Sequence, residues 1–483
     1  MELKDLAALF LMAVAISGGV VATCLSQRAR AAAFFLLILA SAFTDRVDVN
    51  FVTRYWYRAA TRGFEISLVD ILAISLLISS LLLPRPGHRR WFWPASLGAM
   101  IIYFLYCCFS VAISEPKLFG LFELSKILRG ILVFLAAAVY VQTERELRLL
   151  VLALGCAICF QGVLALKHRY VNGVYRVTGS LLDPNSLSMY LCTTAPVFFA
   201  AAASNFPKYL RKFCLLCSGI TAVTILLTIS RAGIPIFALV ALGATMACAS
   251  FRITFKKTAA VFLVCLALGG MVYKSWDTLK VRYGQASLKE EYLGEQFENR
   301  GSYLRQAWAI LQDRFFGVGL NNWSYWVSEV YGPQLGIFYE AYPNTSDAPS
   351  KDAVGSFTFA PPAHSLMALT AGELGWPGLM IFLLVWLRWF QMGASFLRPR
   401  SPEAMHRLGV GFFFSTCGIF LQSQTEWTYR QTHIFYTFNV LLGALASLYY
   451  VKRQAARTPI DTNALTEEFS GNVPSAEPPL ACR

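Results

Sequence analysis

The sequence predicts an all-helical protein that crosses a membrane many times. Of its 483 residues, 56% are hydrophobic and only 14% are charged, whereas a soluble domain carries about 25% charged residues. The apolar residues come in runs close to the roughly 17–25 residues that a transmembrane helix needs, and they predict about 12–13 helices. One polar stretch, 274–363, interrupts these runs, and we expect it to form a large, partly helical exterior loop.

Windows of this size give thirteen candidate spans. The first follows Glu2, Lys4 and Asp5 rather than a basic segment, so we interpret it as a span and not as a cleavable signal peptide. The second is short, which leaves about twelve helices as the alternative. The candidates lie near 6–25, 29–43, 64–83, 94–113, 121–141, 148–166, 185–203, 212–229, 232–250, 257–273, 364–390, 407–426 and 431–451.

The spans divide the chain into four parts. We expect N-terminal helices over 1–166, a core over 167–390 that includes the loop 274–363, and C-terminal helices over 391–451. The tail 452–483 lacks apolar periodicity and is expected to be disordered.

Basic residues mark one set of alternating connections, which the positive-inside rule assigns to the cytoplasm. This placement accounts for the net charge of +14 without nucleic acid, and the loop 274–363 is slightly acidic, with 8 basic and 10 acidic residues. The loop is therefore expected outside and the C-terminus in the cytoplasm. The marking residues are Arg28, Arg30, Arg85, Arg89, Arg90, Arg145, Arg148, Lys208, Arg211, Lys212, Arg252, Lys256, Lys257, Arg398, Arg400 and Arg407.

The 12 cysteines exclude a disulfide-stapled outer domain, because none lies within 274–363 and all but Cys482 fall in or beside apolar runs. Cys214 and Cys217 form a CxxC pair, but it lies in an apolar run without a second pair. We expect no metal or redox role there.

Two ionisable residues at membrane boundaries are candidates for chemistry. His364 joins the polar loop to an apolar run, and an imidazole there could act as an acid or base, or simply start a helix. Arg231 sits between two apolar runs with almost no loop around it. An arginine in such a place is a functional candidate, and phosphate is its natural partner.

Other exterior segments carry weaker signals. Residues 44–63 mix arginines with Tyr55, Trp56 and Tyr57, which favours a headgroup belt, with contact to an anionic lipid phosphate as the alternative. The segment 167–184 brings Arg176 to the outer face, and Asn185 is expected to start the next helix. Apolar residues at helical spacing predict an amphipathic helix over 303–311. The polar segment from Glu426 to His433, which contains Arg430, is expected to line the same exterior cavity as His364.

Four ordered motifs resemble the O-antigen ligase and polymerase superfamily, which includes some protein O-oligosaccharyltransferases. The resemblance covers roughly 170–390, whereas the first 160 residues match only as generic spans. Two departures are Arg314-Phe315-Phe316, where the family usually has a proline, and Ser365, where it often has asparagine. The motifs are GSLLDPNSLSMYL at 179–191, ISRAGIPIFAL at 229–239, NRGSYLRQAWAIL at 299–311 with GVGLNNW at 317–323, and AHSLMALTAGELGWPG at 363–378.

The resemblance implies a helical fold of the lipid-linked glycosyltransferase type in the bacterial inner membrane, with the large loop periplasmic. It implies transfer of a glycan from undecaprenyl diphosphate to a hydroxyl of a glycan, lipid A-core or protein acceptor, without a metal or other cofactor. His364 would be the catalytic base. The diphosphate would be bound by Arg231 and Arg300, which match family positions, and by Arg176 and Arg305, which lie nearby in the sequence.

Three residues are given supporting roles: Glu373, Asn185 and Arg430. Glu373 lies nine residues beyond His364, or about 13 Å along a helix, so we expect it to be structural. The motifs leave ligase, polymerase and protein O-oligosaccharyltransferase open. A flippase or transporter is the alternative from another class, although we find no convincing internal repeat. A structural scaffold would leave the exterior arginines unexplained.

Overall fold

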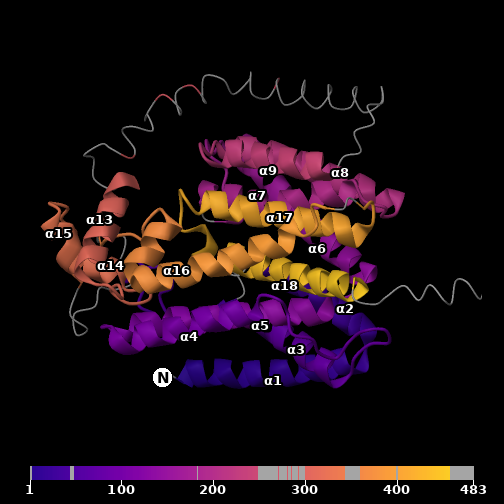
Figure 1. Cartoon of the computed structure of the whole chain (residues 1–483), viewed down its shortest axis with the longest axis horizontal. Helices are drawn as coiled ribbons and strands as arrows, with labels where there is room; N and C mark the ends of the chain where they lie inside the picture. The colour runs from indigo at the N-terminus through magenta and orange to yellow at the C-terminus, as the bar shows by residue number, and fades with distance from the viewer. Residues whose placement is uncertain are drawn as a thin grey trace, which may run out of the picture.

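Long helices lying side by side form the body of the molecule (Figure 1). The structure is a computed structural model that describes residues 3–43, 48–181, 183–248, 300–342, 359–398 and 401–456, with single residues at 270, 280, 284 and 292. The predicted span at 257–273, most of 274–299, the segment 343–358 and the tail beyond 456 fall outside these ranges. Within them, 6 helices are long and apolar enough to cross a membrane, which confirms an all-helical polytopic membrane protein.

Every other predicted span corresponds to a helix whose ends differ from the prediction by a few residues. The first six are α1 (Leu3–Leu25), α2 (Gln27–Ser41), α3 (Leu68–Leu82), α4 (Leu97–Ile113), α5 (Lys117–Tyr140) and α6 (Glu144–Leu166). The others are α7 (Pro184–Ala202), α8 (Lys208–Thr228), α9 (Gly233–Cys248), α16 (Leu366–Ala394), α17 (Ala404–Gln422) and α18 (Thr432–Ala455).

Short elements gather at one end of this bundle. α13 (Arg300–Asp313) contains the amphipathic helix predicted for 303–311, which is confirmed. The other short elements are a π-helical turn (Lys167–Val171), α14 (Trp323–Trp326), a second π-helical turn (Val327–Tyr331), α15 (Gly332–Gln334) and the 3₁₀ turn η6 (Thr428–Arg430). We call this the His364 end, and it comprises the described residues of 48–67, 167–184, 300–342, 359–366 and 423–432.

Close helix contacts hold the bundle together where small residues allow them. α5 packs against α18, and a Cβ added at Gly443 would lie 2.4 Å from the carbonyl oxygen of Phe134. α7 packs against α8, α9 and α17. Because lipid chains are as apolar as the helix surfaces, such close backbone packing contributes strongly to association within a membrane.

The region 48–67 differs from the prediction. The span expected from 64 begins instead with a strand, β2 (Phe64–Ser67), which pairs antiparallel with β1 (Asp48–Phe51). The headgroup belt expected for 44–63 is also wrong for two of its aromatic residues. Trp56 and Tyr57 are buried against the protein, and the Tyr57 ring stacks on Phe119 with 3.7 Å between ring centroids.

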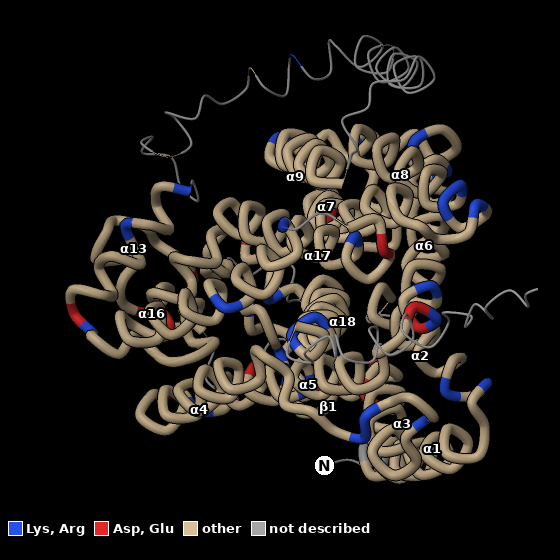
Figure 2. The backbone as a smooth tube through the Cα atoms, turned by 45° about the vertical axis from the view of Figure 1, so that its right-hand side comes forward, with Lys and Arg blue, Asp and Glu red and all other residues tan. Residues whose placement is uncertain are grey.

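Lys and Arg residues occur at the opposite end of the bundle. Figure 2 shows Lys and Arg near the ends of α2, α6 and α8 that lie away from α13. These helices begin near Arg28, Arg145 and Lys208. The positive-inside rule would place this end in the cytoplasm, and the orientation of the protein stays a prediction.

Candidate active site

A cavity of about 530 Å³ opens at the His364 end and collects polar side chains from separate parts of the chain. The hairpin loop between β1 and β2, the start of α7, the segment before α16 and the α17–α18 connection all contribute. The polar lining residues are Asn50, Thr53, Tyr55, Arg62, Glu65, Asp183, Asn185, Ser186, His364, Glu426, Gln431, Thr432 and His433.

His364 lies immediately before α16. Ser365 is the N-cap, and its hydroxyl accepts a hydrogen bond from the backbone N–H of Ala368 at 3.4 Å. The imidazole itself does not cap the helix, so the simple helix-start interpretation does not describe its side chain. The ring is 40% exposed and faces the cavity, and Tyr303 of α13 lies beside it with 5.5 Å between ring centroids.

Glu426 is the direct partner of His364. The imidazole Nδ1 lies 2.5 Å from Oε2 of Glu426, whose side chain is only 8% exposed. A hydrogen bond at this nitrogen assigns the proton to Nδ1, and it leaves Nε2 as an acceptor in the neutral ring. An imidazole oriented by a carboxylate in this way can accept a proton and hold the resulting charge.

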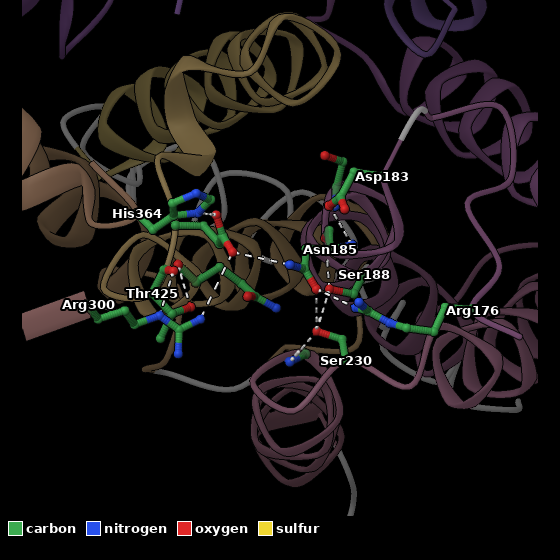
Figure 3. A network of polar contacts seen from close by, with 12 residues as sticks. Arg176, Asp183, Asn185, Ser188, Ser230, Arg300, His364 and Thr425 are labelled. Atoms are coloured by element: carbon green, nitrogen blue, oxygen red, sulfur yellow. Dashed lines mark hydrogen bonds and ion pairs between the residues drawn. The ribbon is translucent and has the colours of Figure 1, made fainter. Parts of the chain in front are cut away.

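The other oxygen of Glu426 joins two further residues (Figure 3). Asn185 donates from Nδ2 to Oε1 at 3.2 Å, and Nη2 of Arg300 lies 4.0 Å from the same oxygen. Arg300 also donates from Nε to the carbonyl oxygen of Thr425 at 3.2 Å. The first residue of α13 is therefore attached to the α17–α18 connection beside His364.

Asn185 extends the network toward α8 and α9. Its Oδ1 accepts from Nη2 of Arg176 at 2.9 Å and from the hydroxyl of Ser230 at 3.4 Å. Arg176 also donates to the carbonyl oxygen of Thr228 at 3.2 Å. The helix starts at Pro184 and its N-cap is Asp183, so Asn185 links the network rather than capping the helix.

The turn between α8 and α9 has an unusual backbone. Ile229 has φ 51° and ψ 39°, a left-handed conformation that is a genuine outlier for a β-branched residue. Such conformations cost about 1–3 kcal/mol and cluster at functional sites. Ser230 follows and caps α9 by accepting from the N–H of Gly233 at 3.2 Å. Arg231 is the next residue and is partly buried. Its neighbour Ser230 belongs to the hydrogen-bond network that contains His364.

Arg305 lies on another face of α13 from Arg300. Five residues of an α-helix turn through about 140° beyond a full turn, so the two side chains diverge. Arg305 is exposed, and it does not line the cavity. The predicted diphosphate role of Arg305 therefore has no geometric support, whereas Arg176 and Arg300 belong to one network.

The GVG turn after α13 packs against a break in α16. At Gly375 the helix has φ 66° and ψ −168°, and the freed carbonyls of Gly372 and Glu373 accept from the N–H groups of Val318 and Gly319 at 2.9 and 2.8 Å. A Cβ at Gly375 would lie 2.1 Å from the carbonyl oxygen of Phe315. The sequence motifs at 317–323 and 363–378 thus contact each other. This contact fixes the end of α13 against α16, the helix that begins after His364.

Glu373 and Arg430 belong to a second cluster, buried behind the cavity. Arg430 donates from Nη1 to Glu373 and from Nε to Glu123, the latter at 3.0 Å, and its carbonyl oxygen accepts from Lys126. Burial alone would lower the pKa of Arg430, but the carboxylates of Glu123 and Glu373 raise it above its ordinary value. Glu373 is held by Arg430 in this cluster, and the structural role expected for it stays a prediction.

Sequence reasoning did not assign roles to three lining residues. Glu426 was recognised only as part of a polar segment, although an acid at the end of an apolar run was a usable signal. Arg62 and Glu65 lie in the hairpin region, where the sequence Arg62-Gly63-Phe64-Glu65 resembles a start seen in exopolysaccharide members of the superfamily but gives neither residue a role. Burial lowers the pKa of Arg62, and the neighbouring Arg58 acts in the same direction. Among the described residues, no three His, Cys, Asp or Glu side chains gather as a possible metal-binding group.

The middle of the chain is similar to a known protein family. Residues 216–383 match the family model described as O-Antigen ligase. The match begins in α8 and ends in α16, so it includes the α8–α9 turn, α13 and His364. No curated protein matches the chain.

Proposed function

We propose that this membrane protein, whose residues 216–383 form an O-antigen ligase family domain, transfers a glycan from a polyprenyl diphosphate to an acceptor hydroxyl in the His364 cavity. The family match itself indicates a glycosyltransferase-like enzyme of polysaccharide assembly. The observation that carries the finer proposal is the His364–Glu426 pair on the wall of a polar cavity, with Arg300 on the same carboxylate.

His364 is the proposed general base. The acceptor oxygen forms a bond to the anomeric carbon while its proton passes to Nε2 of His364, and Glu426 stabilises the imidazolium. At the same time the bond from the anomeric carbon to the phosphate oxygen breaks, and its electron pair leaves on the diphosphate. The proton and the electron pair are both accounted for, so the step needs no redox partner.

The leaving diphosphate needs positive charge. Arg176 and Arg300 lie on either side of the Asn185–Glu426 contact, and Arg231 follows Ser230 of the same network. Guanidinium groups form bidentate, charge-assisted bonds to phosphate. Arg176 donates to the protein from Nε and Nη2, so its Nη1 group is available for a phosphate. Such preorganised charge is usually the largest catalytic contribution.

An apolar groove supports a polyprenyl donor. A hollow of about 430 Å³ lies between α9, α16 and α17, and α9 begins two residues after Arg231. A polyprenyl chain lying there would have its diphosphate near the arginines. The apolar lining residues are Leu239, Val240, Leu242, Gly243, Met246, Phe390, Phe414, Cys417, Phe420 and Leu421.

The His364 end is proposed to face the outside of the bacterial inner membrane. Lys and Arg at the opposite end support this orientation through the positive-inside rule. Metal independence is also part of the proposal, because proton removal by His364 and the positive charge of the arginines together account for the chemistry.

Reconstitution with a lipid-linked repeat unit tests the reaction. Proteoliposomes of the purified protein are expected to release one polyprenyl diphosphate for each glycan transferred, with chelator present or absent. A ladder of products would identify a polymerase, and a single shift of an added lipid or protein acceptor would identify a ligase. Movement of intact donor across the bilayer without cleavage of its sugar–phosphate bond would contradict the proposal and favour a transporter.

A further inference from the structure

A second cavity, of about 480 Å³, lies at the end of the bundle opposite His364. α2 and α6 form its two walls, and the connection after α3 covers its polar end. The two cavities share no lining residue. This cavity is therefore distinct from the proposed active site.

The cavity wall formed by α6 changes from basic to apolar residues along the helix. Arg145, Arg148, Leu149 and Leu152 all line the cavity, and their spacing of three, four and seven residues places them on one helix face. The wall is thus basic at the helix start and apolar deeper in the bundle. The exposed side chains of Phe160 and Val163 continue the apolar surface of α6 beyond the cavity.

The residues at the polar end of this cavity are held in place by contacts with one another. Arg85 donates from Nη1 to Glu146 at 2.8 Å and from Nη2 to the carbonyl oxygen of Tyr140 at 2.8 Å, and its guanidinium lies 4.2 Å from the Tyr140 ring centroid. His88 lies 3.3 Å from the same carboxylate oxygen of Glu146. Because these contacts fix Arg85, the cavity has a preformed cationic wall.

Positive charge is in excess around the cavity. The lining has three arginines, Arg85, Arg145 and Arg148, but only one acid, Glu146. Glu146 is 3% exposed and engaged by Arg85. Arg148 pairs with Glu144 at 2.6 Å, but both side chains are more than a third exposed, and such a pair is readily exchanged for another anion.

We propose that this cavity binds an anionic phospholipid, with the phosphate at Arg145 and Arg148 and an acyl chain along Leu149 and Leu152. Basic pockets between membrane helices recognise anionic headgroups. The apolar wall selects a lipid over a free phosphate, since a free anion would leave that wall exposed. The site is independent of the proposed transfer reaction.

Native mass spectrometry of the full-length protein tests the site. The protein is titrated with phosphatidylglycerol and with phosphatidylcholine of the same chains, and inorganic phosphate is then added as a competitor. We expect phosphatidylglycerol to bind in preference to phosphatidylcholine and to resist phosphate at millimolar concentration. Equal binding of the two lipids, or displacement by phosphate alone, would overturn the proposal without the use of any variant.

Variants locate the lipid within the molecule. Arg145→Gln/Arg148→Gln is expected to weaken phosphatidylglycerol binding by about fivefold for each charge, or about twenty-five-fold together. Lys208→Gln/Lys212→Gln removes the same charge from the exposed start of α8 at the same end, and it should leave the affinity unchanged. Equal losses in the two double variants would show a diffuse charge effect and refute the site.

Discussion

Two clusters of acids and bases at the His364 end contain similar residues in different surroundings. The Arg430 cluster includes Glu123, Glu373 and Lys126, and each of its side chains is buried. In the His364 cluster, His364 and Glu426 line the cavity, Arg300 lies beside Glu426, and the imidazole is 40% exposed. Charges that are satisfied by one another hold helices together, whereas charges beside open space can act on a substrate.

Removal of the buried arginine is expected to have the largest effect on stability. Arg430→Gln leaves Glu123 and Glu373 without their shared partner, which should cost about 3–5 kcal/mol of unfolding free energy. Thermal unfolding in detergent measures this loss. Arg300→Gln, at a residue beside Glu426, is the matched control and should unfold within a few degrees of wild type. Equal destabilisation by the two changes would erase the distinction between the clusters.

Arg231, which follows Ser230 of the hydrogen-bond network around His364, tests the other side of the comparison. Arg231→Lys keeps the charge but loses the planar fork, and removal of one preorganised donor costs roughly a hundredfold to a thousandfold in turnover. Turnover of a lipid-linked donor is measured beside Arg305→Lys, which changes an exposed arginine of α13 and should stay near wild type. Full activity of the Arg231 variant would show that this arginine acts through its charge alone or is structural.

Glu426 is expected to have a smaller effect, because it acts through His364. A hydrogen bond to a charged group contributes about 1.5–3 kcal/mol, so Glu426→Gln should lower kcat roughly tenfold to a hundredfold. KM and the unfolding temperature should change little. Glu426→Asp, which retains the carboxylate, should recover part of kcat. A Gln variant that loses stability instead of kcat would place Glu426 with the buried cluster.

The sequence predicts most of the fold because hydrophobic runs of fixed length report membrane helices directly. Each predicted span within the described residues corresponds to a helix. The β1–β2 hairpin could not be predicted, because its strands are four residues long and Phe64–Ser67 adjoins the apolar run of α3. The buried positions of Trp56 and Tyr57 depend on tertiary contacts with Phe119, which composition does not report.

The candidate site was predicted in part. His364 and Arg231 stand out because ionisable groups at a membrane boundary are costly. The partner of His364 is 62 residues away in the chain, and only the packing of α16 against α17 brings the two together. The divergence of Arg305 from Arg300 follows from helical phase alone and could have been inferred.

Glycan transfer by the His364→Ala variant is the most direct test of the proposed mechanism. Single-turnover release of polyprenyl diphosphate is measured in proteoliposomes, with the unfolding temperature as the check on folding. His168→Ala, a histidine at the same end that does not line the cavity, is the matched control. We predict a rate lowered by roughly 10²–10⁴-fold for His364→Ala, with an unchanged unfolding temperature. Near-normal release by a folded His364→Ala protein would contradict the proposed role of His364 as the general base.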